Sequence, residues 1–318
     1  MPPAGPDEYS DHVDDSVYTN AGVIQALTHA AAVGALVGQD AALLAPWLDA
    51  AARLVVVYDA ARGYHPESAN YTRGTKVKQA DTVLLGFPFE FQHDTFSPAS
   101  RAADLAYYAS VTDAGGPAMT WGVFAVGLIE LGAGFEAAAA SNFNRSFANA
   151  QPPFGVWLET PTGGTIGFNT GAGGFLQTAF NGYTGLRVNS SGAFFRPALG
   201  EGMGTLGLRG MAYLGNRLNV DYNAATVAVE VVAAAAAAAG GARDELAALG
   251  LLPPHPLSLL PREPLAQRSQ RARVRLAGGH VQPQLPLALV DAAGAAHALL
   301  PGQPLVLPRQ AFALVQAQ

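Results

Sequence analysis

Two glutamates in loops rich in glycine and aromatic residues are the side chains of this chain best suited to acid–base chemistry. Glu8 lies in GPDEY (5–9), and Glu159 lies in VWLE (156–159). Only 13% of the 318 residues are charged, so a carboxylate in such a loop stands out. Two carboxylates across a glycosidic bond can protonate the leaving oxygen and activate water. Simple surface exposure is the competing interpretation, because most carboxylates in proteins are solvated.

A second polar stretch, KVKQAD (76–81), places two hydrogen-bond donors side by side. Lys78 and Gln79 are adjacent, which suits a ligand that carries many hydroxyl groups. An exposed helix start explains the same pair without any ligand. The stretch is therefore a candidate binding segment rather than a motif that is specific by itself.

Several other chemistries find no support in the sequence. The chain has no cysteine, its 7 histidines lack metal-site spacing, and no GxSxG elbow occurs. NTGAGG (169–174) looks like a phosphate cradle but lacks the lysine of a P-loop. We therefore expect no cofactor and no metal. The net charge of −6 argues against a nucleic-acid partner, and no apolar run is long enough to predict a membrane span.

The spacing of apolar residues, which predicts the helices and strands that must position these side chains, changes along the chain. Helical patterns with long glycine- and proline-rich loops predict helices near residues 16–36, 41–58, 76–85, 99–111, 117–132 and 170–184. From about residue 186 the period becomes two, and alternation predicts strands at 217–223 and 226–232. Later stretches, PLALVDAAGAAHALL and LVLPRQAFALV, predict further strands. The expected fold class is mainly α followed by β.

Seven stretches, taken in this order, resemble glycoside hydrolase family 65. They are GPDEYSDHVDDSVYTN, YHPE, KVKQADTVLLGFP, GPAMTWGVFAVGLIEL, RSFAN, VWLE and TGAGGFLQ. The resemblance covers about residues 4–232. It implies a fold with an N-terminal β-sandwich, an (α/α)6 barrel and a C-terminal β-sheet domain.

This resemblance also implies domain boundaries. Residues 1–186 would form the second half of the (α/α)6 barrel, and residues 187–232 and 265–318 would form the C-terminal antiparallel β-sheet domain. Residues 233–264 would be a low-complexity linker. The tryptophan-aspartate motif of the family and its first β-sandwich have no counterpart in the sequence. We therefore expect a C-terminal fragment whose half barrel exposes apolar flanks.

The implied activity is that of an inverting α-glucosidase. Its substrate would be an α-glucoside such as a collagen-derived glucosylgalactosyl-hydroxylysine unit. The resemblance makes Glu8 the general acid and Glu159 a further essential carboxylate, which its position suggests is the base. It also implies that Lys78 and Gln79 contact the transferred glucosyl unit. Inversion predicts carboxyl groups roughly 6.5–9.5 Å apart, and we expect partial burial among aromatic residues to keep Glu8 protonated.

Related activities remain open at this point. The phosphorylase branch of the family has histidine and serine near the glycine turn, whereas FNTGAGG (168–174) has neither, which favours hydrolysis. A disaccharide phosphorylase, a trehalase and a catalytically inactive carbohydrate-binding or interaction fragment are the alternatives. The relatives imply a cytoplasmic location.

Overall fold

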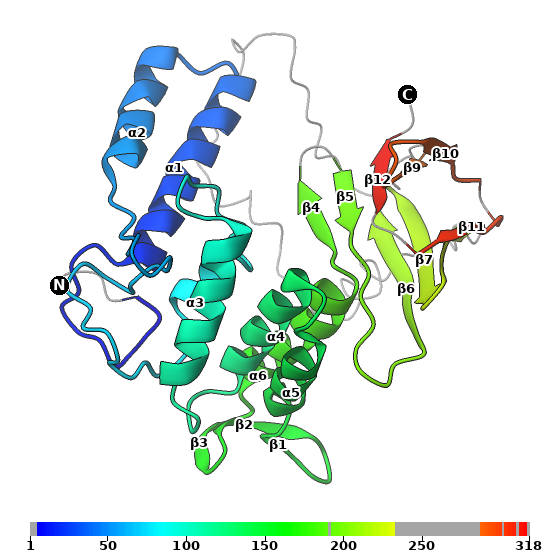
Figure 1. The fold of residues 1–318 in the computed structure, drawn as a ribbon. Coiled ribbons are helices and arrows are strands. Elements are labelled where there is room, and N and C mark those ends of the chain that lie inside the picture. The colour runs from blue at the N-terminus through cyan, green and yellow to red at the C-terminus, as the bar shows by residue number, and fades with distance from the viewer. Residues whose placement is uncertain (1–4, 190–191, 233–286, 301, 310–311, 317–318) are drawn as a thin grey trace, which may run out of the picture.

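A helical part and a part built from antiparallel strands lie side by side (Figure 1). The computed structural model describes residues 5–189, 192–232, 287–300, 302–309 and 312–316. The linker predicted over 233–264, and the first residues of the segment predicted to start at 265, lie outside the described residues. Among the described helices, none has both the length and the apolar character needed to cross a bilayer.

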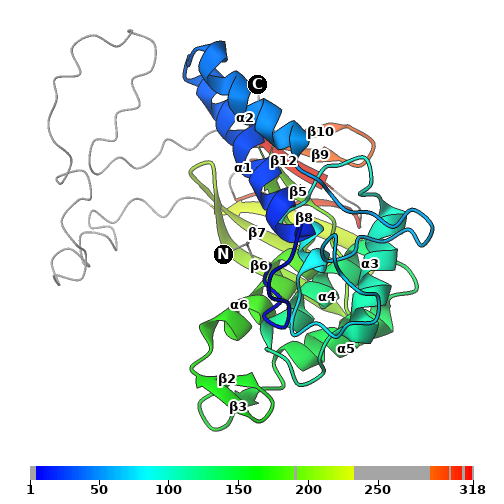
Figure 2. The same ribbon diagram turned by 90° about the vertical axis from the view of Figure 1, so that its left-hand side faces the viewer.

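Six α-helices make up most of the helical part. They are α1 (Val17–Leu36), α2 (Ala41–Arg53), α3 (Pro98–Val111), α4 (Met119–Leu131), α5 (Glu136–Ser146) and α6 (Asn169–Gln177), which continues as a π-helix (Thr178–Tyr183). Helices α1 and α2 form a hairpin that extends away from α3–α6, as the turned view in Figure 2 shows. The predicted helices near 16–36, 99–111, 117–132 and 170–184 are confirmed.

Local chemistry explains where the first two helices begin and end. The Ser16 side chain accepts a hydrogen bond from the Thr19 N–H and caps α1, and Asp40 caps α2 in the same way. Helix α2 ends at Arg53, five residues before the predicted end at Tyr58, because an extended residue and three consecutive valines follow it.

Helix α4 is the centre of the helical part. Every residue from Thr120 to Gly127 is buried, and α4 packs against α3, α5 and α6. A Cβ added at Gly122 would lie 2.5 Å from the Gly174 carbonyl oxygen, so glycine is required for this close approach of α4 and α6. The helix thereby fixes the position of the loops at its ends.

The predicted helix near 76–85 is wrong. Only Thr82–Leu85 are helical, as a 3₁₀-helix, and residues 76–81 are irregular. The backbone of Val77 is hydrogen-bonded to Val111 and Asp113 instead of to its own helical turn. Tertiary hydrogen bonds thus replace the local bonds that a helix would need.

A small sheet and helix α5 were not predicted. The sheet has the order β1-β2-β3 and is formed by β1 (Ala150–Gln151), β2 (Val156–Thr160) and β3 (Gly163–Ile166). It lies at the opposite end of the helical part from the α1–α2 hairpin (Figure 2). Because β2 carries VWLE, this sheet positions Glu159.

The remaining strands form two antiparallel sheets. They are β4 (Arg187–Asn189), β5 (Gly192–Phe195), β6 (Thr205–Tyr213), β7 (Asn216–Asn223), β8 (Thr226–Val232), β9 (Leu287–Asp291), β10 (Ala296–Ala298), β11 (Leu305–Pro308) and β12 (Phe312–Gln316). Their orders are β10-β9-β12-β5-β4 and β11-β8-β7-β6. The predicted strands at 217–223 and 226–232 are confirmed.

One apolar core joins the two larger sheets into a sandwich. Leu218 and Val220 of β7 and Val229 of β8 pack in the same cluster as Leu289 and Leu314 from the other sheet. The alternate residues of β7 and β8 point outward, as the period of two predicts.

Candidate active site

The loop at Gly5–Tyr9 is tied to the segment Lys78–Asp81 by three hydrogen bonds besides the Glu8–Lys78 ion pair. The Asp7 N–H donates to Asp81 Oδ2 at 3.1 Å, and the Lys78 N–H donates to Asp7 Oδ1 at 2.6 Å. The Gln79 side-chain amide donates to the Pro6 carbonyl oxygen at 2.5 Å. Two motifs that lie about seventy residues apart in the sequence therefore form one clamp.

The residues of the loop fit this clamp closely. A Cβ added at Gly5 would lie only 2.4 Å from Asp81 Oδ2, so no larger residue is accommodated without a shift. The Asp7 carboxylate also accepts from the Tyr9 N–H at 3.2 Å and from Ser10 Oγ at 3.0 Å, which closes a tight turn. Asp7 is fully buried, and its neighbour Glu8 consequently faces outward.

Glu8 is ion-paired in this structure. Its Oε2 lies 2.5 Å from Lys78 Nζ, and 65% of the Glu8 side chain is exposed. The prediction that Glu8 is partly buried among aromatic residues is therefore wrong. The reason is that Asp7, not Glu8, occupies the buried side of the turn.

Glu159 is held by the turn between β2 and β3. Its Oε2 accepts a hydrogen bond from the Thr165 N–H at 3.0 Å. This bond lowers the pKa of Glu159, and the positive charge of Lys78 lowers that pKa further. Gly164 has a φ of +78°, and a Cβ there would lie 2.8 Å from Glu159 Oε2. The carboxylate is thus ionised near neutral pH, as a general base must be.

One connection brings the two glutamate-bearing segments together. The Ala118 N–H donates to the Glu159 carbonyl oxygen at 2.9 Å, and the Asp113 N–H donates to the Val77 carbonyl oxygen at 2.8 Å. The short segment from Asp113 to Ala118 therefore spans from β2 to the residue before Lys78. The hydrogen bond to Glu8 raises the pKa of Lys78, and the charge of Glu159 contributes in the same direction. Lys78 thus acts electrostatically on both candidate carboxylates.

Gln79 is engaged within the clamp. Its side chain is buried, and its amide donates to the Pro6 carbonyl oxygen. In this structure Gln79 therefore stabilises the loop that carries Glu8.

Sequence reasoning missed Asp7 and Glu67 behind the loop, and it noted Asp81 only as a local cap or pairing partner. Asp7, Glu67 and Asp81 are all buried, at 0%, 3% and 2% exposure. Burial raises the pKa of Glu67, as do the charges of Asp81 and Asp7, and burial also raises the pKa of Asp81. No local pattern distinguishes these carboxyl groups from exposed ones, because tertiary structure alone buries them.

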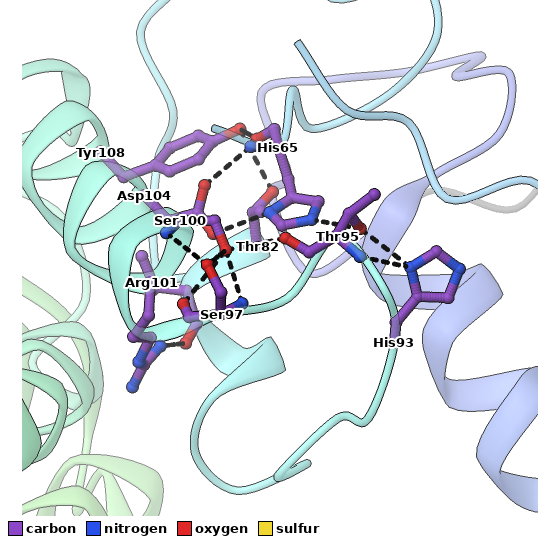
Figure 3. A network of polar contacts seen from close by, with 10 residues as sticks. His65, Thr82, His93, Thr95, Ser97, Ser100, Arg101, Asp104 and Tyr108 are labelled. Atoms are coloured by element: carbon purple, nitrogen blue, oxygen red, sulfur yellow. Dashed lines mark hydrogen bonds and ion pairs between the residues drawn. The ribbon is translucent and has the colours of Figure 1, made fainter. Parts of the chain in front are cut away.

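A polar network centred on His65 anchors the segment that carries Glu67 (Figure 3). Asp104 of α3 accepts from the His65 N–H at 2.7 Å, and His65 Nδ1 lies 2.9 Å from the other oxygen of the same carboxyl group. His65 Nε2 lies 2.9 Å from Thr95 Oγ1, and Tyr108 Oη donates to the His65 carbonyl oxygen. These bonds fix His65 on α3, and with it the neighbouring Glu67.

Two cavities of the described structure are lined by neither Glu8 nor Glu159. The larger, of about 850 Å³, lies between α4 and β5 and is lined by Glu130, Arg187 and Phe195 among others. The smaller is lined by Tyr64, Arg73 and Tyr107. The larger cavity therefore lies away from the candidate acid and base.

The chain is similar over most of its described length to known glycosidases. It is 42% identical over 229 residues to protein-glucosylgalactosylhydroxylysine glucosidase of Mus musculus, which is 72% of this chain and 32% of that protein. The protein of the same name from Danio rerio is 43% identical over 71% of this chain and 34% of its own length. Kojibiose hydrolase of Mucilaginibacter mallensis is 32% identical over 58% of the chain.

Structure comparison agrees at the level of the fold. A putative kojibiose phosphorylase from the human microbiome superposes with a TM-score of 0.56 at 14% identity, covering 72% of this chain and 36% of that one. No protein-family profile matches the chain. The chain spans about a third of the length of the curated relatives from mouse and zebrafish.

Proposed function

The chain belongs to a glycosidase family of the glycoside hydrolase family 65 type. From this membership we propose that it carries the acid–base pair of an α-glucosidase. The proposed substrate is the glucosylgalactosyl-hydroxylysine unit for which its relatives are named. The observation that supports this best is the position of Lys78, which interacts with both Glu8 and Glu159. The cytoplasmic location implied by the resemblance is part of the same proposal.

The proposed reaction inverts the configuration at the sugar carbon. Glu8 donates its proton to the glycosidic oxygen as that bond breaks. Glu159 removes a proton from the water molecule that attacks the opposite face of the ring. The depressed pKa of Glu159 keeps it able to accept that proton. Glu8 must first leave its ion pair with Lys78 and take up a proton from water, and Lys78 is then free to donate to a sugar hydroxyl group.

The architecture proposed around this pair is the second half of an (α/α)6 barrel, over residues 1–186, followed by a C-terminal β-sheet domain. Within the described residues, the strands between 187 and 232 and from 287 onward would form that domain. The structural likeness to the putative kojibiose phosphorylase supports the fold in general terms. The exposed apolar residues of the α1–α2 hairpin, such as Leu36, Val37 and Leu43, fit a helical layer that continues beyond it.

A specific observation favours a second candidate, an inactive carbohydrate-binding fragment. Glu8 is largely exposed and neutralised by Lys78, and the chain spans about a third of its relatives. The two candidates differ in turnover. Glucose release by the 318-residue chain, measured on glucosylgalactosyl-hydroxylysine with and without added phosphate, distinguishes them. Release of free glucose supports the hydrolase, phosphate-dependent formation of glucose 1-phosphate in place of glucose supports a phosphorylase, and binding without either product supports the inactive fragment.

A further inference from the structure

Three buried carboxyl groups meet behind the loop that carries Glu8. Asp7, Glu67 and Asp81 come from three separate segments, and none of them takes part in a salt bridge within the described part of the chain. The described residues also contain no group of acidic or histidine side chains arranged to hold a metal ion. Three adjacent carboxylates would repel one another strongly, so at least one of them must hold a proton.

The hydrogen bonds around these groups show where that proton is needed. Asp7 already accepts from the Lys78 N–H, the Tyr9 N–H and Ser10 Oγ. Asp81 Oδ2 accepts from the Asp7 N–H. By contrast, Glu67 Oε1 and Asp81 Oδ1 are buried without any hydrogen-bond donor. Buried acceptors without donors are costly, and the side chains of Glu67 and Asp81 are close enough for a hydrogen bond that lowers the pKa of Asp81. A single proton held between the two carboxyl groups would relieve that cost.

We propose that Glu67 is a carboxylic acid that shares its proton with Asp81 and thereby positions the loop that carries Glu8. The inference rests on the proposed role of Glu8 as the general acid. Glu67 and Asp81 are positioning residues in this scheme, because they act on Glu8 only through Asp7. The proton stays between Glu67 Oε1 and Asp81 Oδ1 and is not consumed in the reaction.

The positioning runs through consecutive hydrogen bonds. The shared proton holds Asp81 with its Oδ2 toward the Asp7 N–H, and the Asp7 carboxylate holds the backbone of Tyr9 and Lys78. Glu8 lies between two residues fixed in this way, and its ion-pair partner Lys78 is fixed by the same carboxylate. Loss of the proton would add a negative charge beside Asp7 and Asp81 and weaken the whole clamp.

The surroundings favour the protonated form. Apart from Asp7, the titratable groups that interact with Glu67 and Asp81 are phenols. Tyr71 and Tyr108 interact with Glu67, and Tyr18 interacts with Asp81. Burial is the main cause that raises the pKa of Glu67, and the neighbouring carboxylates add to it. Two residues before Glu67, His65 is bound to Asp104 of α3 (Figure 3).

Amide hydrogen exchange tests the shared proton without requiring activity. Exchange of residues 5–10 and 77–79 is measured by mass spectrometry on the 318-residue chain, as protection relative to intrinsic rates, between pH 7 and 10. The wild-type chain should lose protection at least about tenfold over this range as Glu67 ionises. The Glu67→Gln variant, which has the same shape and cannot ionise, should keep it. The exposed control Glu201→Gln should behave like the wild type.

The outcome is decisive in either direction. Equal loss of protection in the wild type and in Glu67→Gln, or no loss in either, overturns the proposal that Glu67 and Asp81 share a proton. A second measurement addresses positioning near neutral pH: kcat should fall about tenfold or more in Glu67→Ala, which cannot donate to Asp81, and should stay near the wild-type value in Glu67→Gln, whose amide can donate. Equal kcat in these two variants overturns the positioning role. A wild-type chain that releases no glucose contradicts the proposed function instead, and the exchange experiment then still decides the protonation of Glu67.

Discussion

Lys78 Nζ lies 2.5 Å from Glu8 Oε2, and the same ammonium group lowers the pKa of Glu159. One cation therefore acts electrostatically on both carboxylates that we propose as acid and base. The backbone of this lysine is held by the buried Asp7, so its position is set by the fold and not only by the ion pair.

Replacing Lys78 by methionine should separate binding from folding. The ion pair with Glu8 is largely exposed, so its loss should change the free energy of unfolding by less than about 1 kcal/mol. The loss of a sugar-facing donor should lower kcat/KM by about tenfold or more. Urea unfolding and initial-rate kinetics on the same preparation measure both. Unchanged kinetics would remove Lys78 from the proposed site.

Replacing Gly5 by alanine should disrupt the clamp. The new Cβ would lie 2.4 Å from Asp81 Oδ2, and relief of this clash must move the loop or the buried carboxyl group. We expect destabilisation of about 1–3 kcal/mol and a large loss of kcat. Gly115→Ala is the matched control, because its nearest contact would be an ordinary 3.6 Å. Equal behaviour of the two variants would argue against a functional clamp.

Glu67 should make stability depend on pH in a defined direction. Its ordinary pKa of 4.5 is raised to about 9 in the folded chain, chiefly by burial. Between these values the folded chain holds a proton that the unfolded chain has released, so this group lowers stability as pH rises. The melting temperature of Glu67→Gln minus that of the wild type should therefore increase from pH 5 to pH 9. A constant difference across this range is inconsistent with a protonated Glu67.

Glu159 should set the acid limb of activity. The Thr165 N–H and the charge of Lys78 lower its pKa, so the base stays ionised below the usual range of a glutamate. The acid limb of kcat/KM should accordingly lie below pH 4.5, the ordinary pKa of the group. Glu159→Gln should reduce kcat by about 10²–10⁴-fold, as expected for loss of a general base. A reduction of only a few-fold would assign Glu159 another role.

The strands of the sandwich could be predicted from the sequence because their alternation is local. Val227, Val229 and Val231 point inward as the period of two requires. The irregular segment around Lys78 could not be predicted, since its geometry is set by Asp7 and Pro6 far away in the chain. The β2–β3 hairpin escaped prediction because VWLETPTGGTI does not alternate clearly.

The candidate site shows the same division. Glu8, Lys78 and Glu159 could be identified as a group only through the resemblance, and the structure now relates all three electrostatically. The buried Asp7 and Glu67 could not be recognised, because the residues next to a carboxylate in the sequence do not reveal whether the fold buries it. Gln79 illustrates the opposite case, in which an apparent ligand-binding donor is engaged by the backbone of Pro6.

The anomeric form of the first product tests the central claim most directly. Proton NMR during hydrolysis of an α-glucoside by the 318-residue chain records whether α- or β-glucose appears before the two interconvert. The proposed roles of Glu8 and Glu159 predict β-glucose first, with release abolished in Glu8→Gln and in Glu159→Gln. Initial release of α-glucose, or undiminished release by either variant, would contradict the assignment.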